Sequence, residues 1–165
     1  MARFALQHMP APEAGAALLA ALPRIEGDLK IGLIGSLGQR GDRKAVAEIA
    51  ALATDGDAGI ARTSIRALGR IGGPQAAEAL AKIEAPPELA AARDNAYLMC
   101  ADSMLAEGRT DEALKIYSNM LSADNGTWIR IAAYKGFVQA KKEEAVPVVL
   151  ALLKDKDLNL QRAAG

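Results

Sequence analysis

The sequence has few aromatic residues, a single cysteine and no excess of either charge. Of its 165 residues, aromatic side chains make up 4% and charged side chains 24%. The one cysteine, Cys100, excludes a disulfide within the chain. No apolar run reaches the roughly 18 residues that a membrane-spanning helix needs. The scarcity of aromatic and β-branched residues argues against a β-sheet protein.

The charges are balanced both overall and locally. Lysine plus arginine and aspartate plus glutamate number 20 each. Residues 1–82 carry ten basic and eight acidic side chains, and residues 83–165 carry ten and twelve. Because non-specific binding to nucleic acid depends on a basic face, this distribution makes nucleic acid an unlikely partner.

The apolar start of the chain does not have the form of a signal peptide. Pro10, Pro12 and Glu13 interrupt it, and the leucines that follow have helical spacing. We therefore predict a repeat helix at the start, with no membrane association. The cellular compartment stays open.

A period of 31 residues organises the first half of the sequence. Leu37-Gly38 recurs as Leu68-Gly69, and Gly41 recurs as Gly72. Apolar residues account for 51% of the chain, mostly as alanine, leucine, isoleucine and valine, which is a helical composition. A fixed period of this length without strand signals indicates stacked helical hairpins. We predict an all-α fold, a right-handed α-solenoid of about five hairpins.

Helices are expected over the ranges 2–9, 12–23, 28–40, 42–54, 57–71, 74–84, 88–107, 110–122, 126–140, 142–154 and 157–164. Asp28, Asp57 and Thr110 are expected to cap the helices that follow them. The third hairpin is longer than the others, because Gly72 and Gly108 lie 36 positions apart. We expect one domain over residues 1–165 with incomplete first and last repeats, cut from a longer protein.

A second pattern pairs a helix cap with an arginine five residues later. We interpret these pairs as structural, with the arginine bonding to the neighbouring repeat. The pairs are Asp57 with Arg62, Asn125 with Arg130, and Asp157 with Arg162.

Three segments, residues 60–72, 128–137 and 155–164, resemble the bacterial HEAT-like repeat of the phycobilisome-lyase type. The hairpin at about 88–122 departs from it and is similar to the tetratricopeptide pattern, in which Tyr97, Cys100, Met104 and Tyr117 fall at core positions. The resemblance implies a scaffold that binds a protein partner on the concave face lined by the second helix of each hairpin. Residues expected there are Lys44, Glu48, Gln75, Glu78, Lys82, Lys115 and Asn119.

No catalytic or ligand-binding motif survives inspection. Gly32, Gly35 and Gly38 do not follow a strand, so they are expected at close helix contacts instead of at a phosphate. Asp55-Gly56-Asp57 lacks the later ligands of a calcium loop. His8 and Cys100 lie several helices apart, too far to form a catalytic pair. We therefore expect no enzyme, no cofactor and no metal.

Two roles stay open for Trp128, the single tryptophan: packing against the previous repeat, or an exposed anchor for a partner. The leading hypothesis is a non-catalytic scaffold module that also self-associates through its uncapped ends. The alternatives are a solenoid that binds nucleic acid, and a bilin-lyase-like enzyme or its subunit.

Overall fold

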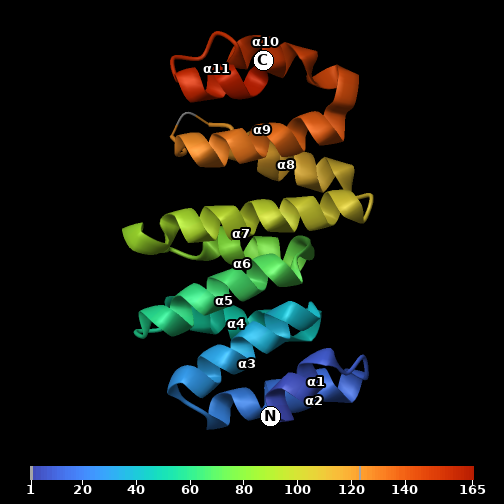
Figure 1. Cartoon of the computed structure of the whole chain (residues 1–165), viewed down its shortest axis with the longest axis vertical. Helices are drawn as coiled ribbons and strands as arrows, with labels where there is room; N and C mark the ends of the chain where they lie inside the picture. The colour runs from blue at the N-terminus through green and yellow to red at the C-terminus, as the bar shows by residue number, and fades with distance from the viewer. Residues whose placement is uncertain (1, 123) are drawn as a thin grey trace. The chain divides into compact units, whose positions relative to one another are not determined.

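The structure, a computed structural model, describes residues 2–122 and 124–165. These residues form helices and turns and contain no β-strand. The first half holds α1 (Ala2–His8), α2 (Pro12–Ala21), η1 (Leu22–Arg24), α3 (Gly27–Arg40), η2 (Arg43–Ala45), α4 (Val46–Ala51), η3 (Leu52–Thr54), α5 (Ala58–Ile71) and α6 (Gly73–Lys82). The second half holds α7 (Pro87–Ala106), α8 (Thr110–Met120), α9 (Thr127–Lys141), η4 (Lys142–Ala145), α10 (Val146–Leu152) and α11 (Leu158–Ala164) (Figure 1).

All the helices that the sequence predicts are present, and the fold class, an all-α solenoid of helical hairpins, is confirmed. The helices expected over 12–23, 42–54 and 142–154 each begin or end in a turn of 3-10 helix. Such turns are common at helix ends.

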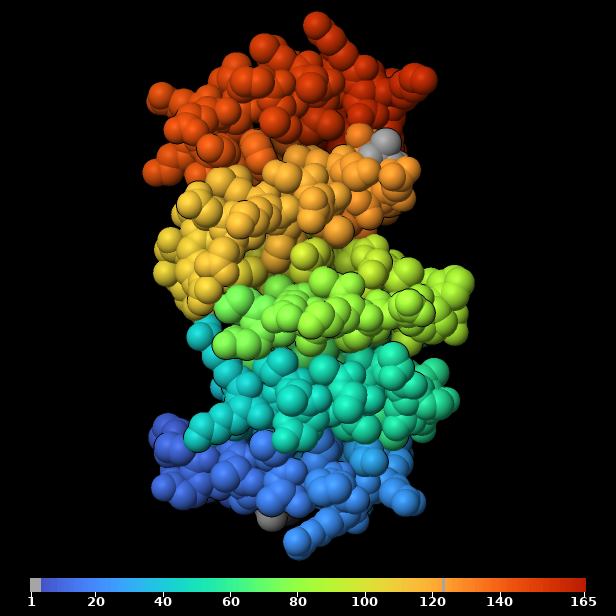
Figure 2. Space-filling model, turned by 180° about the vertical axis from the view of Figure 1, so that it is seen from behind, coloured from blue at the N-terminus to red at the C-terminus, as the bar shows by residue number. Residues whose placement is uncertain are grey.

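The chain divides into two compact units, residues 1–100 and residues 101–165, with the boundary inside α7. In the first unit, α3 packs against α1, α2 and α5, and α4 packs against α5 and α6. In the second, α9 packs against α8 and α11, and α11 also packs against α10. Within each unit, successive hairpins lie next to one another in chain order (Figure 2). The expectation of a single domain stays a prediction.

The first helices of consecutive hairpins approach one another at glycine. A Cβ placed on Gly38 would lie 2.8 Å from the Cα of Ala67, and one placed on Gly69 would lie 2.8 Å from the Cα of Ala96. The same contact thus occurs twice, one repeat apart. Gly35 is different, because nothing lies within 4 Å of a Cβ placed there. The expected close contact is wrong for Gly35.

Two glycines end the first helix of a hairpin. Gly41 and Gly72 follow α3 and α5 with φ of 66° and 68°. Residues with a Cβ rarely adopt this region, so the 31-residue recurrence of glycine here has a backbone cause.

Arg40 ties the turn between α1 and α2 to the end of α3, a role that the sequence did not reveal. Its Nη1 donates to the carbonyl oxygens of Leu6 at 2.7 Å and Met9 at 2.5 Å. Its Nη2 donates to the carbonyl oxygen of Ala11 at 3.1 Å. Charge-assisted bonds of this kind are stronger than neutral ones, so Arg40 positions the start of α2.

In the second unit, Tyr117 fills the space above a glycine. A Cβ on Gly136 of α9 would lie 2.3 Å from the Tyr117 ring. The Tyr117 hydroxyl donates to Asp102 Oδ1 at 2.6 Å. Burial raises the pKa of Tyr117, and the hydrogen bond to Asp102 raises it further, so the phenol stays protonated. The ring and this bond fix α8 against α9.

Two caps expected from the sequence are misplaced. Glu26 occupies the N-cap of α3, and Asp28 lies in the first turn of that helix. Arg109 occupies the N-cap of α8, one residue before Thr110. Neither Glu26 nor Arg109 makes a side-chain cap bond, so packing and not capping sets these helix starts.

Gly38→Ala is expected to lower the free energy of unfolding by about 1–3 kcal/mol, because the new methyl group overpacks the α3–α5 contact. Gly35→Ala, three residues earlier on the same helix, serves as the matched control. It is expected to raise the free energy of unfolding by about 0.5–1 kcal/mol, since alanine is the better helix former. Urea denaturation of both variants measures the difference. Equal effects of the two substitutions would contradict the close-contact argument.

Candidate functional site

The residues expected on the concave face of the first unit are all exposed. Lys44 and Glu48 lie beside α4, and Gln75, Glu78 and Lys82 lie on α6. Because α4 and α6 pack against each other, the five side chains occupy adjoining helices. Lys82 donates to Glu78 at 2.7 Å, which holds the pKa of Glu78 below its ordinary value.

The expected site residues of the second unit form a separate set. Lys115 and Asn119 are exposed on α8 and line a hollow there together with Asp111 and Leu114. Trp128 lies in the first turn of α9, the first helix of its hairpin, with 76% of its surface exposed. The interpretation of Trp128 as a packed staple is therefore wrong, and the exposed-anchor alternative is left.

The three cap–arginine pairs do not behave alike. Asp57 accepts from the Gly59 nitrogen at 2.7 Å, and Asp157 accepts from the Asn159 nitrogen at 2.9 Å. Gly126, not Asn125, occupies the N-cap of α9. The Asn125 side chain instead donates to the carbonyl oxygens of Asn119 and Met120 at 3.1 and 3.3 Å. Asn125 therefore closes the end of α8.

Only one arginine of these pairs bonds as expected. Arg130 Nε donates to the Leu121 carbonyl oxygen at 3.2 Å, and its Nη2 lies 2.5 Å from Asp155 Oδ2. Arg62 and Arg162 are exposed, so the expected lacing of the stack by these two is wrong. The Arg130 guanidinium holds the pKa of Asp155 below its ordinary range. A hydrogen bond from Thr127 does the same for Asp157.

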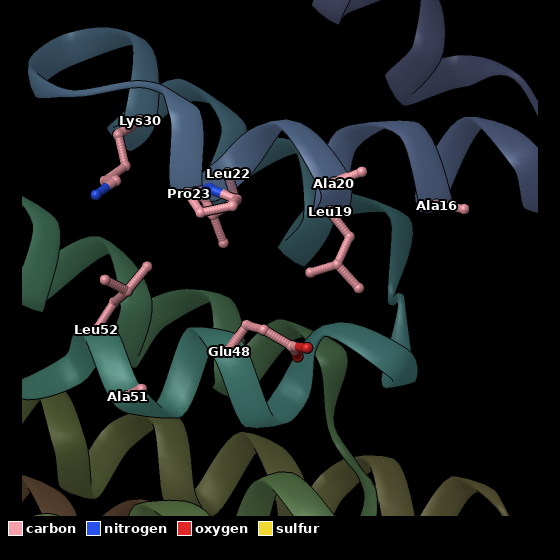
Figure 3. A pocket seen from close by; sticks show the side chains of 9 residues that line it. All are labelled: Ala16, Leu19, Ala20, Leu22, Pro23, Lys30, Glu48, Ala51 and Leu52. Atoms are coloured by element: carbon pink, nitrogen blue, oxygen red, sulfur yellow. The ribbon is translucent and has the colours of Figure 1, made fainter.

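A pocket of about 550 Å³ opens between the α2–η1 segment and the α4–η3 segment. Leu19, Leu22 and Pro23 descend from one side, and Leu52 rises from the other (Figure 3). The remaining lining residues are Ala16, Ala20, Ala51, Lys30 and Glu48. The lining is therefore apolar except for one cation and one carboxylate.

Small side chains account for this pocket. Ala16 and Ala20 on α2 face Ala51 on α4 (Figure 3), and methyl groups leave the space between the two helices unfilled. Leu19 and Leu52 are only half-buried. An apolar hollow of this size on a surface marks a candidate site for a ligand or a partner.

A second hollow of about 390 Å³ continues the first toward the turn between α3 and α4. The two share Ala16 and Leu19. Arg40, Arg43 and Lys44 line the second hollow, together with Asp42, Pro12, Gly15 and Gly41. We call the two hollows together the α2–α4 groove. It is apolar toward η1 and η3 and basic toward η2.

Sequence reasoning missed this groove but selected two residues of it, Lys44 and Glu48. The repeat pattern showed which residues share a face. It held no signal for a gap between α2 and α4, since alanine at a helix surface is equally consistent with close packing.

The two residues considered as a catalytic pair have unrelated surroundings. His8 is exposed on α1, and its Nδ1 lies 2.9 Å from the Phe4 carbonyl oxygen. Cys100 is buried on α7, with its Sγ 3.7 Å from the Leu68 carbonyl oxygen. In the part of the chain that the structure describes, no group of three or more His, Cys, Asp or Glu side chains is placed to hold a metal ion.

Membrane crossing was tested on the same described residues. None of their helices combines the length and the apolar character that a transmembrane span requires.

Comparison with protein families places residues 15–98 in HEAT repeats. No curated protein matches the sequence. Among solved structures, the chain is similar to a chain of the complex of CpcE and CpcF of phycocyanin lyase from Nostoc sp. PCC7120. The two are 25% identical with a TM-score of 0.51, and the match covers 93% of this chain and 63% of that one.

This likeness corrects one expectation. The sequence led us to expect that the chain is not an enzyme, and that conclusion is wrong, since the similar chain belongs to the complex of a lyase. The absence of a catalytic motif did not justify it, because a subunit of an enzyme complex need not carry one.

The Arg130–Asp155 pair predicts how stability depends on pH in the second unit. The pKa of Asp155 is lowered from 3.8 in the folded chain, so the unfolded state binds more protons near that pH. Stability from the pair is present above about pH 4 and is lost as the pH falls through the lowered pKa. Arg130→Met should flatten this loss. Urea unfolding followed between pH 5 and pH 2 tests it.

Arg162→Met is the control, because Arg162 occupies the corresponding position of α11 and is exposed. Its stability should follow the wild-type pH profile. Identical profiles for all three proteins would remove the pair from the account.

Proposed function

The chain belongs to the HEAT repeat family, and on this premise we propose that it is a scaffold that holds a protein partner on the exposed face of α4 and α6 and in the adjoining α2–α4 groove. The groove carries this proposal, since it offers an apolar hollow beside charged groups on one helix face.

Two properties of this face favour a protein over other partners. The central lining of the groove is apolar, as in the cores of protein interfaces, and the charged residues Lys30, Glu48 and Lys44 lie among or beside it. On α6 the charges alternate in sign, with Glu78 paired to Lys82. Nucleic acid is the weaker candidate because the acidic side chains of this face oppose phosphate.

The test is a pull-down from lysate of the native organism, with the chain as bait. A variant with Glu48→Arg, Glu78→Arg and Lys82→Glu is expected to lose a partner that the wild type captures, because all three side chains are exposed on the proposed face. Like-charge contacts across an interface cost several kcal/mol.

A control with Glu84→Arg, Glu88→Arg and Arg66→Glu has the same net change in charge at exposed residues outside α4 and α6, and it should retain the partner. Circular dichroism verifies the fold of both. Retention by both variants would place binding elsewhere, with Trp128 the next residue to change.

The likeness to the lyase complex supports a second candidate, a subunit of a bilin-lyase-like enzyme. The support is the 93% coverage of this chain; no residue here is assigned a chemical role. Since the match covers 63% of the similar chain, a further segment or subunit is included in the test.

Chromophore attachment is measured after mixing the chain with bilin and a phycobiliprotein, with and without the other lyase subunit. A lyase subunit should make attachment depend on the chain, and Leu19→Arg, which fills the apolar hollow, should reduce it. Attachment at the same rate without the chain would exclude this candidate.

A further inference from the structure

The second unit carries an apolar row on the outside of α10. Val146, Leu150 and Leu153 are 53%, 54% and 42% exposed. Their spacing of four and three residues puts them on one side of a helix. Glu143 and Glu144, both exposed, stand immediately before this row. The segment therefore presents an acidic end followed by an apolar stripe.

The core of the unit does not use this row. The opposite side of α10 contributes Leu152, with Val148 and Val149 packed beside it, to a cluster that includes Ile131 and Leu160. The exposed row is thus additional apolar surface. Burying it would be favourable by about 25 cal/mol per Å².

The α2–α4 groove complements this row in chemistry and order. Its basic end holds Arg43 and Lys44, and its apolar hollow reaches Ala51. Lys44 precedes Ala51 by seven residues, and Glu143 precedes Leu150 by seven. Both segments begin as 3-10 turns, η2 and η4, and continue as α-helix. Charged end and apolar contact are therefore about 10 Å apart on each.

We propose that α10 of one copy of this chain docks in the α2–α4 groove of a second copy. Glu143 and Glu144 pair with Arg43 and Lys44, while Leu150 enters the apolar hollow. This inference rests on the proposed function, because the groove is part of the same binding face, and it names a second copy as one partner of that face.

The charges permit this pairing. Glu144 is bound to Lys141 at 2.9 Å, but both side chains are exposed, and such a pair contributes little. In the groove, Lys30, Arg40, Arg43 and Lys44 outnumber the acidic Asp42 and Glu48. An acidic helix end is therefore attracted to the groove.

Each copy offers both a groove and an α10 row, so the contact is head to tail. A contact of this kind closes into a ring or continues as a chain of copies. Its strength should fall with added salt, since the charge pairs lie at the edge of the contact.

The test is sedimentation velocity of the full chain over a range of concentrations. The wild type is expected to exceed the monomer mass of 17.2 kDa increasingly as concentration rises. Arg43→Glu with Lys44→Glu reverses the groove, and Glu143→Lys with Glu144→Lys reverses the helix end. Each double variant should associate at least about tenfold more weakly than the wild type. An equimolar mixture of the two should regain association, because opposite charges face each other again.

Matched controls reverse exposed pairs elsewhere. Arg66→Glu with Arg70→Glu, and Glu84→Lys with Glu88→Lys, change the charge equally and should leave association unchanged. A wild type that stays monomeric at all concentrations overturns the proposal. So does association that neither double variant weakens, because the interface then lies elsewhere.

The scaffold function is tested separately through α6, which lies outside the groove. If self-association fails while a variant with Glu78→Arg and Lys82→Glu still loses a partner from lysate, the scaffold function stands and only the second-copy contact is overturned.

Discussion

The structure depends on the approach of one helix backbone to the next where a side chain is missing. Gly38 lies against Ala67, and Gly69 lies against Ala96. Glycine facing alanine lets α3, α5 and α7 pack closely within the first unit, and it repeats with the period of the sequence. Because these first helices set the spacing of the stack, they also set the distance between the second helices that carry the exposed face.

The candidate site follows from this arrangement together with one arginine. Arg40 at the end of α3 donates to the carbonyl groups that precede α2, and so holds α2 above α4. Alanines on the facing sides leave the space between them open, and Leu19 and Leu52 give it an apolar lining. A rigid frame of close helix contacts thus supports a surface hollow that is free to vary in sequence.

The sequence predicted much of this, and its errors share a cause. Helix positions and exposed faces follow from periodicity, a local property of the chain, and both were read correctly. The caps at Asp28 and Asn125 were misplaced because several polar residues near each helix start can cap it, and only packing selects one. Trp128 was expected to pack since large aromatic residues usually do; it is exposed instead.

By itself, the sequence determined the helical fold, the 31-residue repeat and the residues that each helix turns outward, because these depend on spacing along the chain. The tertiary structure decided which helices lie close and which leave a gap. It placed the Arg40 bonds, the α2–α4 groove and the Arg130–Asp155 pair, whose members are far apart in sequence. These features depend on the fit of whole helices against each other, and alanine or arginine at a given position is compatible with either a closed or an open contact.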